Sequence, residues 1–141
     1  SSDIKDERAY ILEITKAKPK FNTFFEFGIV VTSRHEKFRS MTEHWLLENN
    51  FKYKGLKMYQ GDLSRRKSNM SHSLFKAECY RKSKSRLFVE SNNDQAIEIS
   101  RLSGKQVFCS DNGILYEDGV LSKGRSKAKS MLRYARYLMF R

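Results

Sequence analysis

The sequence alternates between strand-like and helix-like segments, and this alternation constrains the fold more than any other feature. Strand patterns are predicted at 24–31, 56–59, 86–90 and 105–109. Helical patterns are predicted at 6–18, 36–50, 74–82 and 94–103, and a polar stretch over 61–73 reads as a loop. Repeated strand–helix units favour an α/β fold with a mostly parallel sheet that helices cover on both faces.

Polar side chains follow the apolar runs at the carboxyl ends of two predicted strands. The run FGIVV is followed by Thr32, Ser33 and Arg34, and the strand LFVE ends in Glu90. Parallel α/β sheets bind ligands at the carboxyl ends of their strands. Hydroxyl and amide groups there can hold phosphate oxygens, a carboxylate can hold a divalent cation, and Lys76 can neutralise the remaining charge.

The chain is strongly basic, and its charge is uneven. It has 28 Lys and Arg against 16 Asp and Glu, a formal net charge of +12, with no acidic residue after Asp118. A basic amphipathic helix is predicted from residue 126, and either it binds a partner or it packs on its own domain. The charge favours a polyanion such as RNA, with a solubilising surface as the alternative. The candidate contacts are Arg65, Arg66, Lys67, Lys127, Lys129, Arg133 and Arg136.

The cysteines and the hydropathy pattern predict an intracellular protein. Cys79 and Cys109 lie far apart and outside any CxxC spacing, which favours reduced thiols. His35, His44 and His72 have no metal-ligand spacing. The sequence contains neither a secretory signal nor an apolar stretch of about 20 residues. We therefore expect a cytoplasmic or organellar-matrix protein without a membrane span.

Four segments together resemble a known family. FGIVVTSR, HEKFRSMTEHWL, LFKAECYR and LFVESNNDQAIEISRLSGKQVFCSD occur in this order. Over residues 28–111 they resemble the downstream two thirds of a haloacid-dehalogenase-like (HAD) domain, of the type associated with phosphoribosyltransferase proteins. The resemblance implies a three-layer Rossmann-like fold and Mg²⁺-dependent phosphate-ester hydrolysis. It divides the chain into a HAD-like core with an N-terminal helix, 1–111, and a basic extension, 112–141.

The resemblance also assigns roles to residues. A hydroxyl at the end of a strand binds the transferred phosphate, which implies Thr32 or Ser33, with Arg34 beside them. A lysine at a later helix stabilises the phosphate and the nucleophile, which implies Lys76. Acids after a later strand hold Mg²⁺, which implies Glu90, with Asp94 as a second ligand.

One defining part of that superfamily is missing from the 141 residues. They contain no Asp-x-Asp segment, which supplies the attacking aspartate at the end of a central strand. The resemblance places that strand between 24–31 and 86–90. Without it two apolar strand edges stay unpaired, at about 1–3 kcal/mol for each buried orphan group. An upstream segment, a strand from a partner, or direct pairing of the flanking strands could fill the slot.

Two functions therefore remain open. The first is the downstream part of a HAD-like phosphohydrolase domain, inactive alone because its nucleophile is not in this chain. The second is a catalytically dead HAD-like module that serves as a basic nucleic-acid-binding or assembly subunit, for example of a ribonucleoprotein such as a ribosome. The net charge favours the second function, and the combination of Thr32, Lys76 and Glu90 favours the first.

Overall fold

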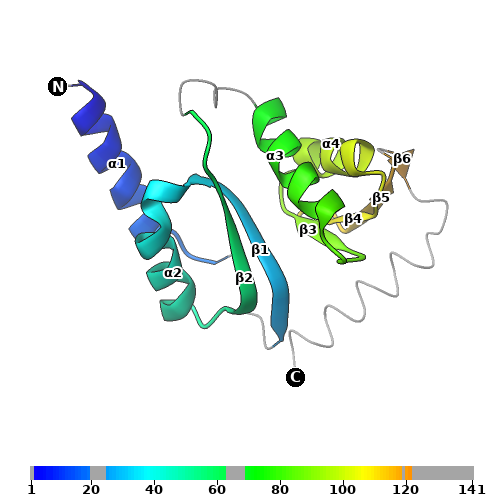
Figure 1. Ribbon diagram of the computed structural model, residues 1–141, viewed down its shortest axis with the longest axis horizontal. Helices are drawn as coiled ribbons and strands as arrows, with labels where there is room; N and C mark the ends of the chain where they lie inside the picture. Colours follow the sequence, from blue (N-terminus) through cyan, green and yellow to red (C-terminus); the bar gives the residue numbers. More distant parts are fainter. Residues whose placement is uncertain (1, 20–24, 63–68, 119, 122–141) are drawn as a thin grey trace.

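The computed structural model describes residues 2–19, 25–62, 69–118 and 120–121, which form a mixed α/β structure with two small sheets (Figure 1). The elements are α1 (Ser2–Lys16), β1 (Glu26–His35), a 3₁₀ turn η1 (Glu36–Phe38), α2 (Arg39–Glu48), β2 (Lys52–Tyr59), α3 (Asn69–Lys82), β3 (Phe88–Glu90), α4 (Asn93–Ser103), β4 (Val107–Cys109), β5 (Ile114–Glu117) and β6 (Val120–Leu121). From α1 to β4 helices and strands alternate, as the sequence predicts, and two further strands follow β4.

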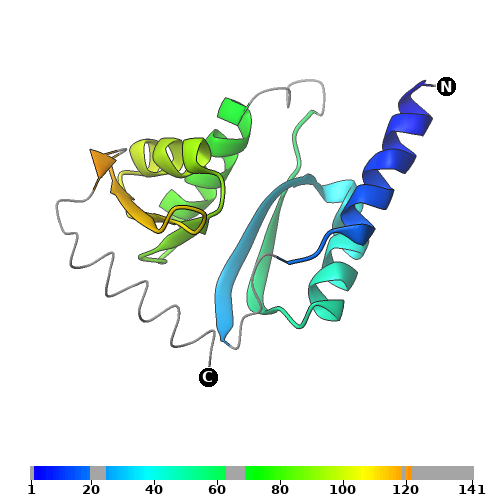
Figure 2. The ribbon, with the colours of Figure 1, turned by 180° about the vertical axis from the view of Figure 1, so that it is seen from behind.

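The first sheet is a parallel pair, β1 and β2, joined through α2. Leu46 of α2 and Met58 of β2 are buried between the helix and the strands, and the Trp45 ring stacks on Phe51 with centroids 5.7 Å apart. This is the expected packing of an apolar helix face on a sheet. Helices α1 and α2 lie on one side of the pair, and α3 lies on the other (Figures 1 and 2).

The second sheet has the order β3-β4-β5-β6. Strands β3 and β4 are parallel, whereas β4–β5 and β5–β6 are antiparallel. Its core joins α3 and α4 to the strands through buried residues that include Tyr80, Ile99 and Val107. Asp118, with φ 51°, lies at the turn between β5 and β6.

The described strands form two separate sheets, with no strand between β1 and β3. Among them, β1 pairs only with β2 and β3 pairs only with β4, so β1 and β3 each lie at the edge of a separate sheet. Direct pairing of the two flanking strands is therefore excluded as the way to fill the slot.

Several element boundaries also differ from prediction, and β1, β2 and α3 extend beyond their predicted ranges. Strand β1 does not stop before Thr32: it continues to His35, since Thr32 pairs with Met58 and His35 with Tyr59 after a register shift. Pairing with β1 likewise starts β2 at Lys52. Helix α3 includes 69–73, a stretch predicted as loop, and Ser73 at the end of this stretch is buried.

Part of the prediction lies outside the described residues. This holds for the C-terminal helix and for the candidate polyanion contacts Arg65, Arg66, Lys67, Lys127, Lys129, Arg133 and Arg136. Among the helices that the structure describes, none combines the length and apolar character needed to cross a membrane.

Candidate functional site

A polar pocket of about 280 Å³ lies at the carboxyl end of β1. Its lining comes from three elements that are far apart in the sequence: the end of β1, the first half of α3 and the first turn of α4. The pocket thus brings together Thr32, Ser33 and Lys76, as predicted from the strand ends. The lining residues are Val31, Thr32, Ser33, Arg34, His72, Lys76 and Gln95.

The two hydroxyls differ in their hydrogen bonds. Thr32 Oγ1 accepts from the backbone N–H of Arg34 at 3.2 Å, at the point where the pairing of β1 with β2 becomes irregular. Ser33 is 9% exposed, and its buried Oγ has no hydrogen-bond partner among the described residues. Buried polar groups are nearly always satisfied, so the Ser33 hydroxyl is a candidate for contact with a water molecule or a ligand at the pocket.

Lys76 forms the charged part of the site. Its Nζ donates to Glu90 Oε2 at 2.5 Å and to Gln95 Oε1 at 2.8 Å. The Lys76 and Glu90 side chains are only 14% and 9% exposed. The second oxygen of Glu90 accepts from the backbone N–H groups of Ser91 and Asn92 at 2.9 and 3.1 Å. The Glu90 carboxylate is therefore fixed on both sides and holds Lys76 in turn.

The carboxylates alone do not form a metal centre within the described part of the chain. Glu90 is not among the residues that line the pocket, and its Oε2 faces Lys76. Asp94 is exposed in the first turn of α4. No three His, Cys, Asp or Glu side chains gather there as ligands would. A Mg²⁺ ion, which takes one or two carboxylates plus water and phosphate oxygens, would need further ligands.

Arg34 lines the pocket, but its guanidinium group lies against Trp45 of α2. The guanidinium carbon is 5.8 Å from the centroid of the Trp45 ring, on the α2 side of β1. Burial lowers the pKa of Arg34, an effect that Tyr10 and Glu13 of α1 partly oppose. Arg34 lies where the pairing of β1 with β2 shifts register, between Thr32 and His35. The geometry favours a packing role for this side chain over phosphate binding.

Sequence reasoning missed two residues of the pocket, His72 and Gln95. His72 lies four residues before Lys76, so a helix beginning at Asn69 puts both on one face, a signal hidden by the loop prediction. Gln95 lies in the first turn of α4, where Asn92 Oδ1 accepts from its backbone N–H at 2.9 Å. Gln95 follows the predicted strand that ends in Glu90, and this position in the sequence could have identified it as a site residue.

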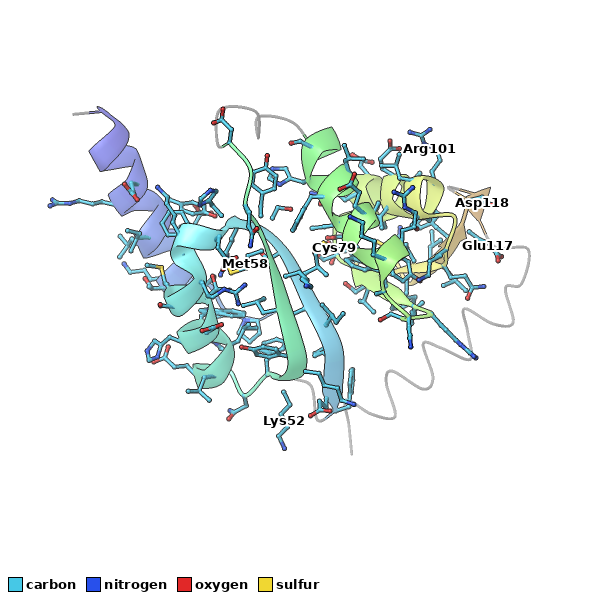
Figure 3. The ribbon with its side chains drawn as sticks, viewed as in Figure 1. Lys52, Met58, Cys79, Arg101, Glu117 and Asp118 are labelled. Carbon is cyan, nitrogen blue, oxygen red and sulfur yellow. The ribbon has the colours of Figure 1, made fainter. Side chains whose placement is uncertain are left out.

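An apolar cleft of about 340 Å³ separates β1 from β3. Helices on both sides of β1 border it: Trp45 and Leu46 come from α2, and Cys79 and Tyr80 come from α3. Cys79 is labelled in Figure 3. Burial raises the pKa of the Cys79 thiol. The rest of the lining is Phe27, Gly28, Ile29, Val30, Val31, Phe51, Ser83, Ser85, Leu87, Phe88 and Val89.

The cleft leads to the pocket along both strands. In β1, residues 27–31 line the cleft and 31–34 line the pocket. In β3, Phe88 and Val89 line the cleft, and Glu90 follows beside Lys76. Both strands thus run in the same direction, from cleft to pocket. Ile29 and Val89 on them are 40% and 51% exposed, unusual values for apolar side chains inside a parallel sheet.

The chain was also compared with known proteins. A comparison with protein-family models found no match, and comparisons with curated proteins and with solved structures found none either.

Proposed function

We propose that this chain is the downstream part of a HAD-like phosphohydrolase domain, which acts on a phosphate ester and is inactive without a segment that supplies its nucleophilic aspartate. The observation that carries the proposal is the unpartnered Ser33 hydroxyl in one pocket with Lys76. A buried hydroxyl and an ammonium at the end of a parallel strand suit the oxygens of a phosphate.

Each described residue has a role in this proposal. The hydroxyls of Ser33 and Thr32 donate to phosphate oxygens, and Lys76 balances their negative charge. Glu90 holds Lys76 in place. Mg²⁺ enters as the cofactor that the family resemblance implies for the completed domain, with Glu90 and Asp94 as its candidate ligands. Among the described residues these two carboxylates do not form its site alone.

The cleft supports a completing segment in the form of a strand. Among the described strands, β1 and β3 each have an unpaired edge, and residues of both line the cleft; backbone groups at such edges accept a further strand. A strand parallel to both would end at the pocket, so the residues after it would lie beside Lys76. Since α2 and α3 both line the cleft, the side chains of such a strand should be apolar on both of its faces. An upstream segment and a partner's strand remain the two sources.

Phosphate binding by the full chain tests the pocket. Inorganic phosphate is titrated while the backbone amide resonances of Ser33 and Arg34 are followed by NMR. We expect saturable shifts at both amides, and a loss of about tenfold or more in affinity in Lys76→Met, because a charge-assisted hydrogen bond is lost. The exposed variant Lys54→Met, on β2, is the control. Equal affinity of the Lys76 variant and the wild type would contradict the proposal.

Addition of a strand tests the reaction. The chain is mixed with Mg²⁺, p-nitrophenyl phosphate and a peptide of about seven β-branched and aromatic residues that ends in Asp-x-Asp. We expect hydrolysis only with this peptide, and none with an Asn-x-Asn peptide or with Lys76→Met. Equal rates with the two peptides would show that no aspartate of the added strand attacks phosphorus.

The net charge of +12 favours a second candidate, a catalytically inactive module that binds RNA. Its test is the affinity for a single-stranded RNA over a range of salt concentrations. If this reading holds, Arg133→Glu with Arg136→Glu lowers the affinity and flattens the salt dependence, because fewer counterions are released. Lys76→Met leaves both unchanged. Normal binding by the charge-reversed chain would exclude this function for the C-terminal segment.

A further inference from the structure

Gln95 and Lys76 are in direct contact in the pocket. The side-chain oxygen of Gln95 lies 2.8 Å from Lys76 Nζ, and both residues line the cavity. The backbone of Gln95 is fixed, because its N–H donates to Asn92 Oδ1 at the start of α4. Gln95 therefore presents its oxygen from the first turn of one helix to a lysine on another.

The chemistry of the two acceptors of Lys76 is different. Glu90 carries a charge and compensates that of the ammonium, whereas the Gln95 amide is neutral. An ammonium has three donors, and within the described residues these two acceptors engage two of them. A neutral acceptor thus orients the ammonium without further reducing the positive charge at the pocket.

We infer that Gln95 is a positioning residue, whose amide oxygen holds the Lys76 ammonium toward an oxyanion in the pocket. The inference rests on the proposed phosphate site. Two hydrogen-bond acceptors then fix the direction of the Lys76 side chain: the Glu90 carboxylate and the Gln95 amide oxygen. Loss of the amide leaves the charge present but lets the ammonium turn away from the pocket.

Two variants separate position from charge. Gln95→Met keeps the length and helix propensity of the side chain and removes its oxygen, whereas Gln95→Glu keeps an oxygen and adds a charge. Glu98→Gln, one turn further along α4, is the control. Each full-length variant is titrated with inorganic phosphate, and the ammonium resonance of Lys76 is followed by ¹H–¹⁵N NMR without phosphate. Thermal unfolding reports a purely structural effect.

For Gln95→Met we expect the Lys76 resonance to shift or broaden and the affinity for phosphate to fall about tenfold, with the melting temperature nearly unchanged. For Gln95→Glu we expect the resonance to stay sharp while the affinity also falls, because the added charge repels phosphate. The control should match the wild type in both readouts.

The inference is overturned if Gln95→Met keeps both the Lys76 resonance and the phosphate affinity of the wild type. If the wild-type chain itself does not bind phosphate, the proposed phosphate site is wrong. The resonance of Lys76 in Gln95→Met then still decides whether Gln95 holds the ammonium, so the two failures are distinguishable.

Discussion

At the scale of single residues, Ser33 is the position where stability and binding oppose each other. Its buried Oγ has no partner in the described ranges, so this hydroxyl is desolvated without compensation in the absence of a ligand. We expect Ser33→Ala to leave the free energy of unfolding unchanged or raise it by about 1 kcal/mol, and to weaken phosphate binding. Urea unfolding and the phosphate titration measure the two effects. A destabilisation above about 1 kcal/mol would show that the hydroxyl has a structural partner.

A second prediction at this scale concerns alkaline pH. Tyr80 is 2% exposed, its hydroxyl donates to the carbonyl of Gln106 at 2.7 Å, and burial raises its pKa to about 12. The unfolded chain loses this proton near pH 10, whereas the folded chain keeps it to about pH 12. The contribution of the protonated Tyr80 hydroxyl to the free energy of unfolding is complete below pH 10 and falls by roughly 2 kcal/mol as the pH rises to 12.

Denaturant unfolding between pH 9 and 12 measures this loss against Tyr80→Phe. The variant lacks the hydrogen bond and is less stable at neutral pH, but its stability should decline less steeply over the alkaline range. Parallel declines in the two proteins would assign the alkaline effect to other groups, such as the many lysines.

At the scale of elements, α4 shows how much a local sequence can determine. Asn92 before the helix and Gly104 after it are residue types that favour an N-cap and a C-cap, and the structure has both caps. Asn92 Oδ1 accepts from the Gln95 N–H, and Gly104 has φ 65° in the left-handed region. These features act within one helical turn, so no distant contact is needed to specify them.

The ends of α4 are therefore open to a direct test. A Cβ at position 104 would meet only ordinary contact, at 3.9 Å from Asp118, so Gly104→Ala reports the backbone strain alone. We expect a loss of about 1 kcal/mol in thermal or urea unfolding, and about as much for Asn92→Ala. If Asn92→Ala also weakens phosphate binding, the cap contributes to the position of Gln95.

The ends of other elements could not be predicted from the sequence. Helix α3 begins at Asn69 inside a polar stretch without periodicity, and only the tertiary structure buries Ser73 there. Strand β1 continues through Thr32 and Ser33 because β2 offers it partners there. Propensity is a weak signal at such positions, where tertiary contacts decide the conformation.

At the scale of the whole molecule, the cleft between β1 and β3 makes a prediction about Cys79. This thiol lines the cleft and its pKa is raised by burial, whereas Cys109 is fully buried. We expect iodoacetamide to modify Cys79 before Cys109, slowly at pH 7 and faster as the pH rises, because the thiolate reacts. Mass spectrometry of peptides follows both sites.

The same reaction detects a strand in the cleft. The apolar peptide used for the hydrolysis test should slow the alkylation of Cys79, with either Asp-x-Asp or Asn-x-Asn at its end. A matched peptide with charged residues in the apolar positions is the control. No protection at any peptide concentration would count against a strand between β1 and β3.

The sequence by itself determined the order of strands and helices, the caps of α4, the basic charge, and the choice of Thr32, Ser33 and Lys76 as one group. These follow from periodicity, from residues within a turn of each other, and from the rule that strand ends carry ligands. Only the tertiary structure decided that the strands form two sheets, that Gln95 joins the pocket, and that Arg34 lies against Trp45. Lys76 is 14 and 19 residues from its two acceptors, and contacts at that separation depend on how the helices pack rather than on any local pattern.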